Sequence, residues 1–287
     1  MRFPHPLHAG WELLRDTLVA FFSDNALSRG AALAYYTVFS LAPVLLIAIA
    51  VAGLLFGRAA AEGAVVRELS GLMGRESAQA LQSLLTGAFF HRGTGYLATV
   101  IGVITLLVTA TGVFVEMQTS LNAIWRAEPT GFTPSEIVRA RLLSLGLVAA
   151  LGFLIVVSLI FSAGLHAASD YLNLLSAKWQ WLLQAGDFVI SFVLLSFVFA
   201  AIYKVLPDRR IAWRDVGVGA VVTTVLFNVG KYAISLYIGG SAIASAYGSA
   251  GSLIVILVWI YYTVQIFFLG AEFTKVYALR RGRFDRR

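Results

Sequence analysis

The sequence predicts an all-α, polytopic membrane protein with six transmembrane helices. Hydrophobic residues make up 59% of the 287 residues and charged residues only 13%, whereas about a quarter of the residues are charged in soluble domains. Several uncharged runs also approach the roughly 20 residues that a helix needs to cross the hydrocarbon of a bilayer. No Pro-rich or Ser-rich linker divides the chain, so we expect residues 1–287 to form a single integral membrane domain.

Six spans follow from the positions of these apolar runs. The first thirty residues mix charges of both signs with apolar residues and lack the short apolar core of a signal peptide, so we expect the N-terminus to be retained. The predicted spans are Ala31 to Phe56, Tyr96 to Val115, Leu142 to Leu165, Trp181 to Tyr203, Trp213 to Ile238, and Ser249 to Gly270.

The distribution of basic residues predicts the orientation of the bundle. With a cytoplasmic N-terminus, sixteen of the 22 Lys and Arg residues fall on the inner side and five on the outer side, while Lys231 lies inside a span. The positive-inside rule therefore favours both termini in the cytoplasm. This asymmetry accounts for most of the net charge of +7 without a nucleic-acid partner. Residues 271–287 form a basic cytoplasmic tail that can attract anionic lipid headgroups.

Two segments are predicted to be helical without crossing the membrane. Residues 7–27 alternate apolar and charged faces at helical spacing, as in a helix that lies in the membrane interface. A similar pattern from Glu62 to Leu85 predicts a helical hairpin on the outer face, between spans one and two. In the N-terminal segment the apolar face contains Trp11, Leu14, Leu18, Phe21 and Phe22, and the charged face contains Glu12, Arg15 and Asp16.

The sequence gives no indication of enzymatic chemistry. Hydrolases and nucleases need clustered His, Asp or Glu residues that activate water or hold a metal, but the four His residues are scattered over both sides of the membrane. The pair Gly230-Lys231 lacks the other residues of a phosphate-binding loop. The chain contains no cysteine for a disulfide or a thiolate site. We therefore expect no enzyme activity, no metal, no cofactor and no nucleic-acid partner.

Lys231 is a candidate functional residue because an ionisable side chain inside a span is costly. Counted inward from the outer helix ends, Lys231 in span five and Asp187 in span four lie at similar depths of about 10 Å. One interpretation is that they pair beside a wet cavity with Asn228 and Tyr232, where a charged headgroup or a proton could bind. The alternative is that Lys231 extends along its own helix to the outer interface and that Asp187 only approaches that interface.

Polar residues also mark the inner ends of two spans. Glu116, Gln118 and Asn122 end span two, and Glu272 follows span six. Glu272 and Lys275 are three residues apart and can therefore face each other on a helix. Anchoring at the membrane interface is the alternative to a functional role for these inner-face candidates.

The segment from Gly239 to Gly251 precedes span six, has no charge and consists almost entirely of small residues. Glycines permit the broken or re-entrant geometry that transporters use near a binding site. A tight outer turn is the alternative interpretation. The candidate gate residues are Gly239, Gly240, Gly248 and Gly251.

Taken together, four stretches resemble the YihY/virulence factor BrkB family of bacterial inner-membrane proteins. They match in order from about residue 20 to residue 280, and they are "SRGAALAYYTVFSLAPVLL", "TATGVFVEMQTSLNAIW", "VLPDRRIAWRDVGVGAVV" and "AYGSAGSLIVILVWIYYTVQIFFLGAEFTKVYA". The resemblance implies six transmembrane helices in a bacterial inner membrane. It carries no catalytic motif, and an earlier ribonuclease label for the family is regarded as mistaken. Lipid or solute export and serum resistance have been suggested across the family.

These observations predict a transporter or lipid-translocating protein, whose outer polar site contains Lys231, Asp187, Asn228 and Tyr232 and whose partners are membrane lipids. The rival hypothesis is a structural or interaction protein that docks envelope proteins, or a second copy of itself, through the outer hairpin and the basic tail. A groove open to the bilayer would favour lipid handling. A closed bundle with exposed apolar patches on the hairpin would favour the rival.

Overall fold

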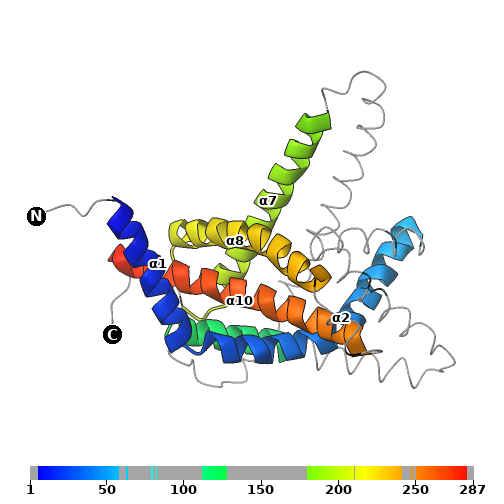
Figure 1. Ribbon diagram of the computed structural model, residues 1–287, viewed down its shortest axis with the longest axis horizontal. Coiled ribbons are helices and arrows are strands. Elements are labelled where there is room, and N and C mark those ends of the chain that lie inside the picture. Colours follow the sequence, from blue (N-terminus) through cyan, green and yellow to red (C-terminus); the bar gives the residue numbers. More distant parts are fainter. Residues whose placement is uncertain are drawn as a thin grey trace, which may run out of the picture.

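The computed structural model describes residues 6–57, 112–127, 180–209, 211–240 and 250–282, together with the single residues 63, 79, 82 and 247. These residues form helices joined by turns and coil, with no strand among them, so the all-α class is confirmed for the described part of the chain. The helices are α1 (Pro6–Ser23), α2 (Ala26–Phe56), a helical segment over 112–124, α7 (Gln180–Val205), α8 (Trp213–Gly240) and α10 (Gly251–Arg280) (Figure 1).

Three of these helices are long and apolar enough to cross a membrane. The qualifying segments are Phe188–Val205, Trp213–Gly240 and Leu253–Arg280, which correspond to the predicted spans four, five and six. Helix α2 contains the whole of the first predicted span. The helical segment over 112–124 begins within the last residues of the second predicted span. The rest of span two, all of span three and nearly all of the predicted outer hairpin lie outside the described residues.

Helix α10 extends ten residues beyond the predicted end of span six at Gly270. The extension packs inside the protein: Ala271, Glu272 and Thr274 are each 0% exposed. Charged residues ended the apolar run at this point in the sequence, but their charges are paired in the fold. Part of the predicted tail, residues 271–280, is therefore a packed helix.

Helix α1 confirms the predicted amphipathic helix and shows where its two faces lie. Its apolar stripe is exposed, with Trp11 66% and Phe22 62% exposed, whereas Phe21 is buried. Its acidic residues bind α10, because Arg280 lies 3.4 Å from Glu12 and 2.6 Å from Asp16. The helix ends at Ser23 rather than at residue 27, because the next helix begins after a tight turn at Asn25, whose φ of 55° asparagine tolerates better than most residues. The interfacial location of α1 stays a prediction.

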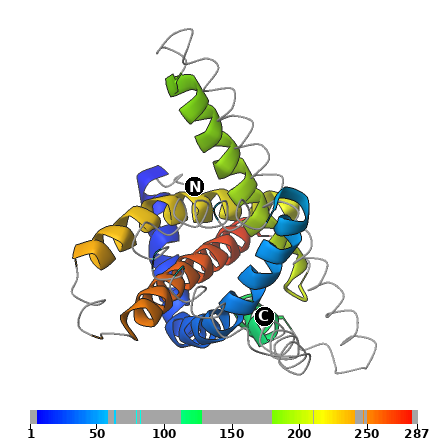
Figure 2. The same ribbon diagram turned by 90° about the vertical axis from the view of Figure 1, so that its right-hand side faces the viewer.

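Helices α8 and α10 run antiparallel and approach closely because glycines on each helix face side chains of the other (Figures 1 and 2). A Cβ atom on Gly219 would lie 1.7 Å from Thr274 Oγ1, and one on Gly270 would lie 1.9 Å from Thr223 Oγ1. Small residues at such positions let helices pack closely in a membrane, where burial of apolar surface gives little driving force. This contact forms the centre of the described bundle.

Helix α7 joins this pair through a buried hydroxyl network. Tyr203 Oη donates a hydrogen bond to Phe267 O at 2.6 Å and lies 3.1 Å from Thr223 Oγ1. Thr223 in turn bonds to Gly219 O at 2.7 Å. Because these buried polar groups have partners, their hydrogen bonds offset the cost of desolvation and join α7, α8 and α10.

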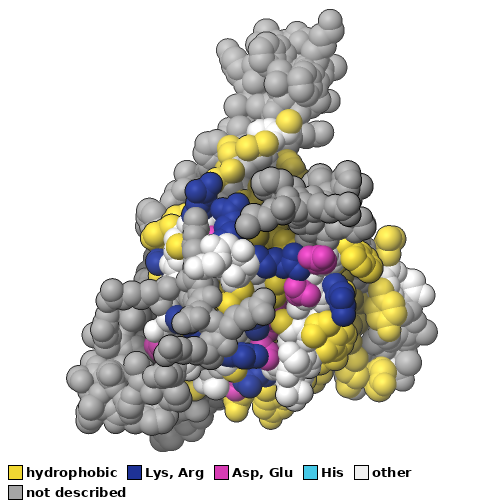
Figure 3. All heavy atoms as spheres, turned by 90° about the vertical axis from the view of Figure 1, so that its left-hand side faces the viewer, with side chains coloured by type: hydrophobic (Ala, Val, Ile, Leu, Met, Phe, Trp, Pro, Cys, Tyr) yellow, Lys and Arg dark blue, Asp and Glu magenta, His cyan; other side chains and the backbone are white. Residues whose placement is uncertain are grey.

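Charged side chains gather at one end of the bundle. The turn between α1 and α2 meets α10 there through Asp24 and Lys275. Lys204, at the end of α7, donates to Ile211 O before α8. Figure 3 shows basic and acidic side chains grouped on this face. Lys231 alone among the described Lys and Arg residues lies away from this end.

Candidate functional site

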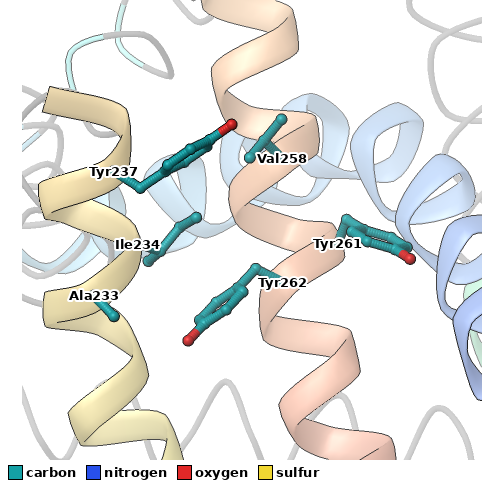
Figure 4. Close-up of a pocket in the computed structure, with 6 residues that line it drawn as sticks. All are labelled: Ala233, Ile234, Tyr237, Val258, Tyr261 and Tyr262. Carbon is teal, nitrogen blue, oxygen red and sulfur yellow. The ribbon is translucent and has the colours of Figure 1, made fainter. Parts of the chain in front are cut away.

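An apolar cleft of about 280 Å³ lies between the C-terminal half of α8 and the N-terminal half of α10. Figure 4 shows the rings of Tyr237 and Tyr262 reaching into the space between the two helices from opposite sides. The cleft is open at the protein surface, where Tyr237 is 59% exposed. Its lining residues are Ala233, Ile234, Tyr237, Val258, Tyr261 and Tyr262.

The cleft ends where Gly230 brings the two helices into contact. A Cβ atom on Gly230 would lie 2.4 Å from Ile266 Cδ1 and 3.0 Å from Tyr262 Cε1. The glycine therefore closes one end of the space, and the larger residues that follow on α8 line the open part. The contact seals the cleft toward the charged end of the bundle.

Lys231 directly follows Gly230 on α8, next to the closed end of the cleft, but it is not among the residues that line the cleft. Its ammonium lies 5.3 Å from the ring centroid of Tyr232, within the range of a cation–π interaction. Asn228 is occupied within its own helix, since its Nδ2 donates to Thr224 O at 2.9 Å. The structure therefore brings Lys231 and Tyr232 together and leaves Asn228 as a helix-bound group.

The predicted pairing of Lys231 with Asp187 stays a prediction, because the side chain of Asp187 lies outside the described residues. Contacts between α7 and α8 join Tyr203 to Thr223 and Phe199 to Phe227. Beyond them α7 diverges from the α8–α10 pair toward its N-terminus (Figures 1 and 2).

The predicted gate segment lies between α8 and α10 in the chain and includes the ends of both helices. Helix α8 ends at Gly240 and α10 begins at Gly251. Gly239 and Gly240 are exposed, and a Cβ on Gly240 would meet no atom within 4 Å. Gly248 lies outside the described residues, and the gating role stays a prediction.

A second polar cluster lies at the charged end, where α10 meets the turn between α1 and α2. Lys275 Nζ lies 2.5 Å from Glu272 Oε2 and 2.6 Å from Asp24 Oδ2. The predicted facing of Glu272 and Lys275 is thereby confirmed, but the pair is buried rather than on a helix surface. The Glu272 side chain is 0% exposed, and those of Lys275 and Asp24 are 11% and 15% exposed. We name Asp24, Glu272 and Lys275 the ionic triad.

The pKa of Asp24 is held below its ordinary value of 3.8. Burial raises this pKa, but hydrogen bonds with Lys275 and Glu272, together with the charges of Lys275 and Arg126, outweigh burial. An acid with a lowered pKa in the fold stabilises the protein above its unfolded-state pKa, and this stability is lost as the pH falls through the folded-state value.

We expect Asp24→Asn to lower the melting temperature at neutral pH and to flatten the loss of stability on acidification. The substitution removes a group that is ionised in the fold and must be protonated as the pH falls below about 4. Thermal unfolding in detergent at a series of pH values, for wild type and variant, measures both effects. Parallel pH profiles for the two proteins would contradict the assignment.

Two of the remaining inner-face candidates, Gln118 and Asn122, contact Asp208, which sequence analysis did not single out. Asn122 Nδ2 donates to Asp208 Oδ2 at 2.6 Å, and Asn122 Oδ1 accepts from the Asp208 backbone N–H at 2.9 Å. Gln118 Nε2 donates to Asp208 Oδ1 at 3.1 Å. Glu116 accepts from Ser120 Oγ at 3.3 Å within its own helix. Gln118 and Asn122 thus anchor the segment after α7 to the segment over 112–124.

Arg209 completes this anchor by donating to Trp125 O at 2.8 Å. The carbonyls of the last helical turn have no partners within the helix, and basic side chains commonly satisfy them. In the sequence, only the stretch "LPDRR" indicates these contacts, because it places an acid and an arginine side by side directly after a predicted span.

We expect Asp208→Ala to destabilise the protein by about 1 kcal/mol, because it removes charge-assisted bonds to Asn122 and Gln118 at a solvent-exposed position. Asp16→Ala, which removes a different exposed carboxylate, is the matched control and should cost less. Thermal unfolding of both variants decides the matter, and a smaller loss for Asp208→Ala than for Asp16→Ala would contradict the anchor role.

Comparison with known families covers almost the whole chain. The family profile described as "Virulence factor BrkB" matches residues 17–286. The chain is 26% identical over 276 residues to a UPF0761 membrane protein of Rhodospirillum centenum, covering 95% of this chain and 59% of the relative. It is 30% identical over 275 residues to a UPF0761 membrane protein of Ralstonia nicotianae, covering 92% and 58% of the two chains.

A third relative is named UPF0761 membrane protein YihY, from Escherichia fergusonii, and is 33% identical over 181 residues, covering 61% of this chain and 58% of the relative. This chain therefore spans less than two thirds of the length of these relatives. No solved structure matches it. The profile match and the membrane-protein relatives establish that the chain is a membrane protein of the YihY/virulence factor BrkB family.

Proposed function

We propose that this protein transports or exports an anionic lipid, and that the α8–α10 cleft receives part of the lipid during its passage. The observation that carries the proposal is the apolar cleft, together with the position of Lys231 on α8 directly after the glycine that closes it. An acyl chain fits an open, apolar groove lined by aromatic side chains. Lys231, about one helical turn before Ile234 on the same helix, offers a charge to an anionic headgroup.

The distribution of charge supports a location of the cleft in the outer leaflet. Because the described basic residues other than Lys231 gather at one end of the bundle, the positive-inside rule favours that end as cytoplasmic and the cleft as facing the outer leaflet. The proposed setting is a bacterial inner membrane with both termini inside. In this orientation Lys231 is the first cationic group that a headgroup entering from the outer leaflet meets on α8.

The test is lipid movement in proteoliposomes that contain the purified protein. Fluorescent phosphatidylglycerol and phosphatidylethanolamine compare anionic and zwitterionic headgroups. We expect Lys231→Met to slow movement of the anionic lipid by about tenfold or more, the effect of losing one charge-assisted contact. We expect Ala233→Phe, which fills the cleft, to slow both lipids.

Two control variants match these substitutions. Arg281→Met removes a cation at the opposite end of the bundle, and Leu236→Phe adds a ring on α8 at a position that is 78% exposed and outside the cleft lining. Both should retain wild-type rates. Lipid movement that is unaffected by Lys231→Met and Ala233→Phe would refute the proposal, as would the absence of movement in wild type. The latter result would shift weight to the interaction-protein hypothesis, whose proposed outer hairpin lies almost entirely outside the described residues.

A further inference from the structure

The ionic triad contains two carboxyl groups and only one ammonium group. Lys275 contacts both acids, at 2.6 Å from Asp24 and 2.5 Å from Glu272. If all three groups are ionised, the site carries a net negative charge in a place where the Glu272 side chain is 0% exposed. A buried, uncompensated charge is costly, and taking up a proton removes it.

The position of the two acids also favours uptake of a proton. Neither carboxylate oxygen of Glu272 has a hydrogen-bond donor of regular geometry, although both are buried. Glu272 and Asp24 nevertheless contact the same Lys275 ammonium, so their carboxyl groups are neighbours. Two ionised carboxylates can only accept, so a hydrogen bond between them forms only when one acid carries a proton. Glu272 is buried more deeply than Asp24, and burial disfavours the ionised form of an acid. Glu272 is therefore the acid that we expect to carry the proton.

The surrounding charges do not replace that proton. Arg126, at the end of the 112–127 segment, contributes to the lowered pKa of Asp24, but it is exposed to solvent, where screening weakens its charge. Arg29 directs its Nε to the backbone carbonyl of Asp24, at 3.1 Å. On α1, the acids Glu12 and Asp16 are paired with Arg280. At this end α8 carries the buried Asp215, another acid, and Arg214, which is exposed to solvent.

We propose that Asp24, Glu272 and Lys275 form a proton-binding site in which Glu272 holds the bound proton. Uptake of one proton from water converts the Glu272 carboxylate to the neutral acid, which can donate to Asp24 while Lys275 contacts both groups. Release of that proton leaves two carboxylates facing each other and weakens the attachment of the α1–α2 turn to α10. The site lies at the opposite end of α10 from the cleft, and it stands independently of lipid transport.

Infrared difference spectroscopy of the full chain in lipid nanodiscs tests the proposal. A protonated carboxylic acid has a carbonyl stretch that a carboxylate lacks, so the spectrum reports the bound proton directly. We expect wild type at neutral pH to show this band and to lose it on alkalinisation. Glu272→Gln should remove the band while keeping the fold, because glutamine is close in shape to the neutral acid. Glu12→Gln, at an exposed acid, should retain it.

Hydrogen exchange at residues 23–26 gives the second readout. Exchange in this turn should rise with alkaline pH in wild type beyond the intrinsic rate increase, and Glu272→Gln should abolish the excess. A wild-type spectrum without the band, or a band that survives Glu272→Gln, would overturn the proposal. Stabilisation by sodium but not by choline, with no protonated acid, would also overturn it and would identify the triad as a metal-cation site.

Discussion

Replacing Gly270 with alanine is expected to separate α8 from α10 and to destabilise the protein by about 1 to 3 kcal/mol, the usual cost of overpacking a well-packed interior. The added Cβ would lie 1.9 Å from Thr223 Oγ1 and 2.7 Å from Tyr203 Oη. Neither distance is sterically allowed, so the substitution must disturb the buried hydroxyl network as well as the helix contact. Thermal unfolding in detergent measures the loss.

Gly217 provides the matched control on α8, because a Cβ there would meet no atom within 4 Å. Gly217→Ala should leave stability unchanged or raise it by up to about 1 kcal/mol, since alanine favours helix more than glycine does. Combining Gly270→Ala with Thr223→Gly should recover part of the loss, because the smaller partner makes room for the new methyl group. Equal melting temperatures for Gly270→Ala and Gly217→Ala would contradict the close helix contact.

Replacing Lys275 with methionine is expected to destabilise the protein by about 3 to 5 kcal/mol at neutral pH, because it leaves two buried carboxyl groups without their shared cation. The loss should shrink on acidification, as protonation neutralises Asp24, the acid of the triad that is ionised at neutral pH. Denaturation followed at neutral and acidic pH, in the same detergent, measures both the loss and its recovery.

Arg280→Met is the control. Like Lys275, Arg280 contacts two acids, here Glu12 and Asp16 of α1, but its side chain is 31% exposed. Surface ion pairs contribute about 1 kcal/mol or less, so this variant should lose much less stability than Lys275→Met. Comparable losses for the two variants would mean that burial does not set the strength of the ionic triad.

Local sequence patterns predicted the elements well where a helix carries its own signal. The apolar runs located the three candidate spans of the described residues, and the alternating faces located α1. The end of α10 was missed because hydropathy treats Glu272 and Lys275 as a membrane boundary. In the fold their charges are satisfied by each other and by Asp24, so the helix continues among buried residues to Arg280.

Contacts between distant segments were less accessible to sequence analysis. The spacing of Glu272 and Lys275 predicted that they face each other, but Asp24 is 251 residues away in the chain. Asp208 likewise lies 86 residues from Asn122. The cleft was also missed, because it opens where the close contact of the two helices at Gly230 ends. Such features depend on the relative placement of helices, which no local pattern contains.

The central claim is that the α8–α10 cleft holds a lipid, and site-specific photocrosslinking in a native bilayer tests it most directly. A photoreactive phenylalanine analogue replaces Tyr237, whose ring reaches into the cleft, or, as control, Leu236, which is exposed on α8 outside the lining. Mass spectrometry then measures the anionic-lipid adduct. We predict an adduct at position 237 that Ala233→Phe abolishes and that exceeds the adduct at position 236. Equal adducts at both positions, unaffected by Ala233→Phe, would contradict the claim.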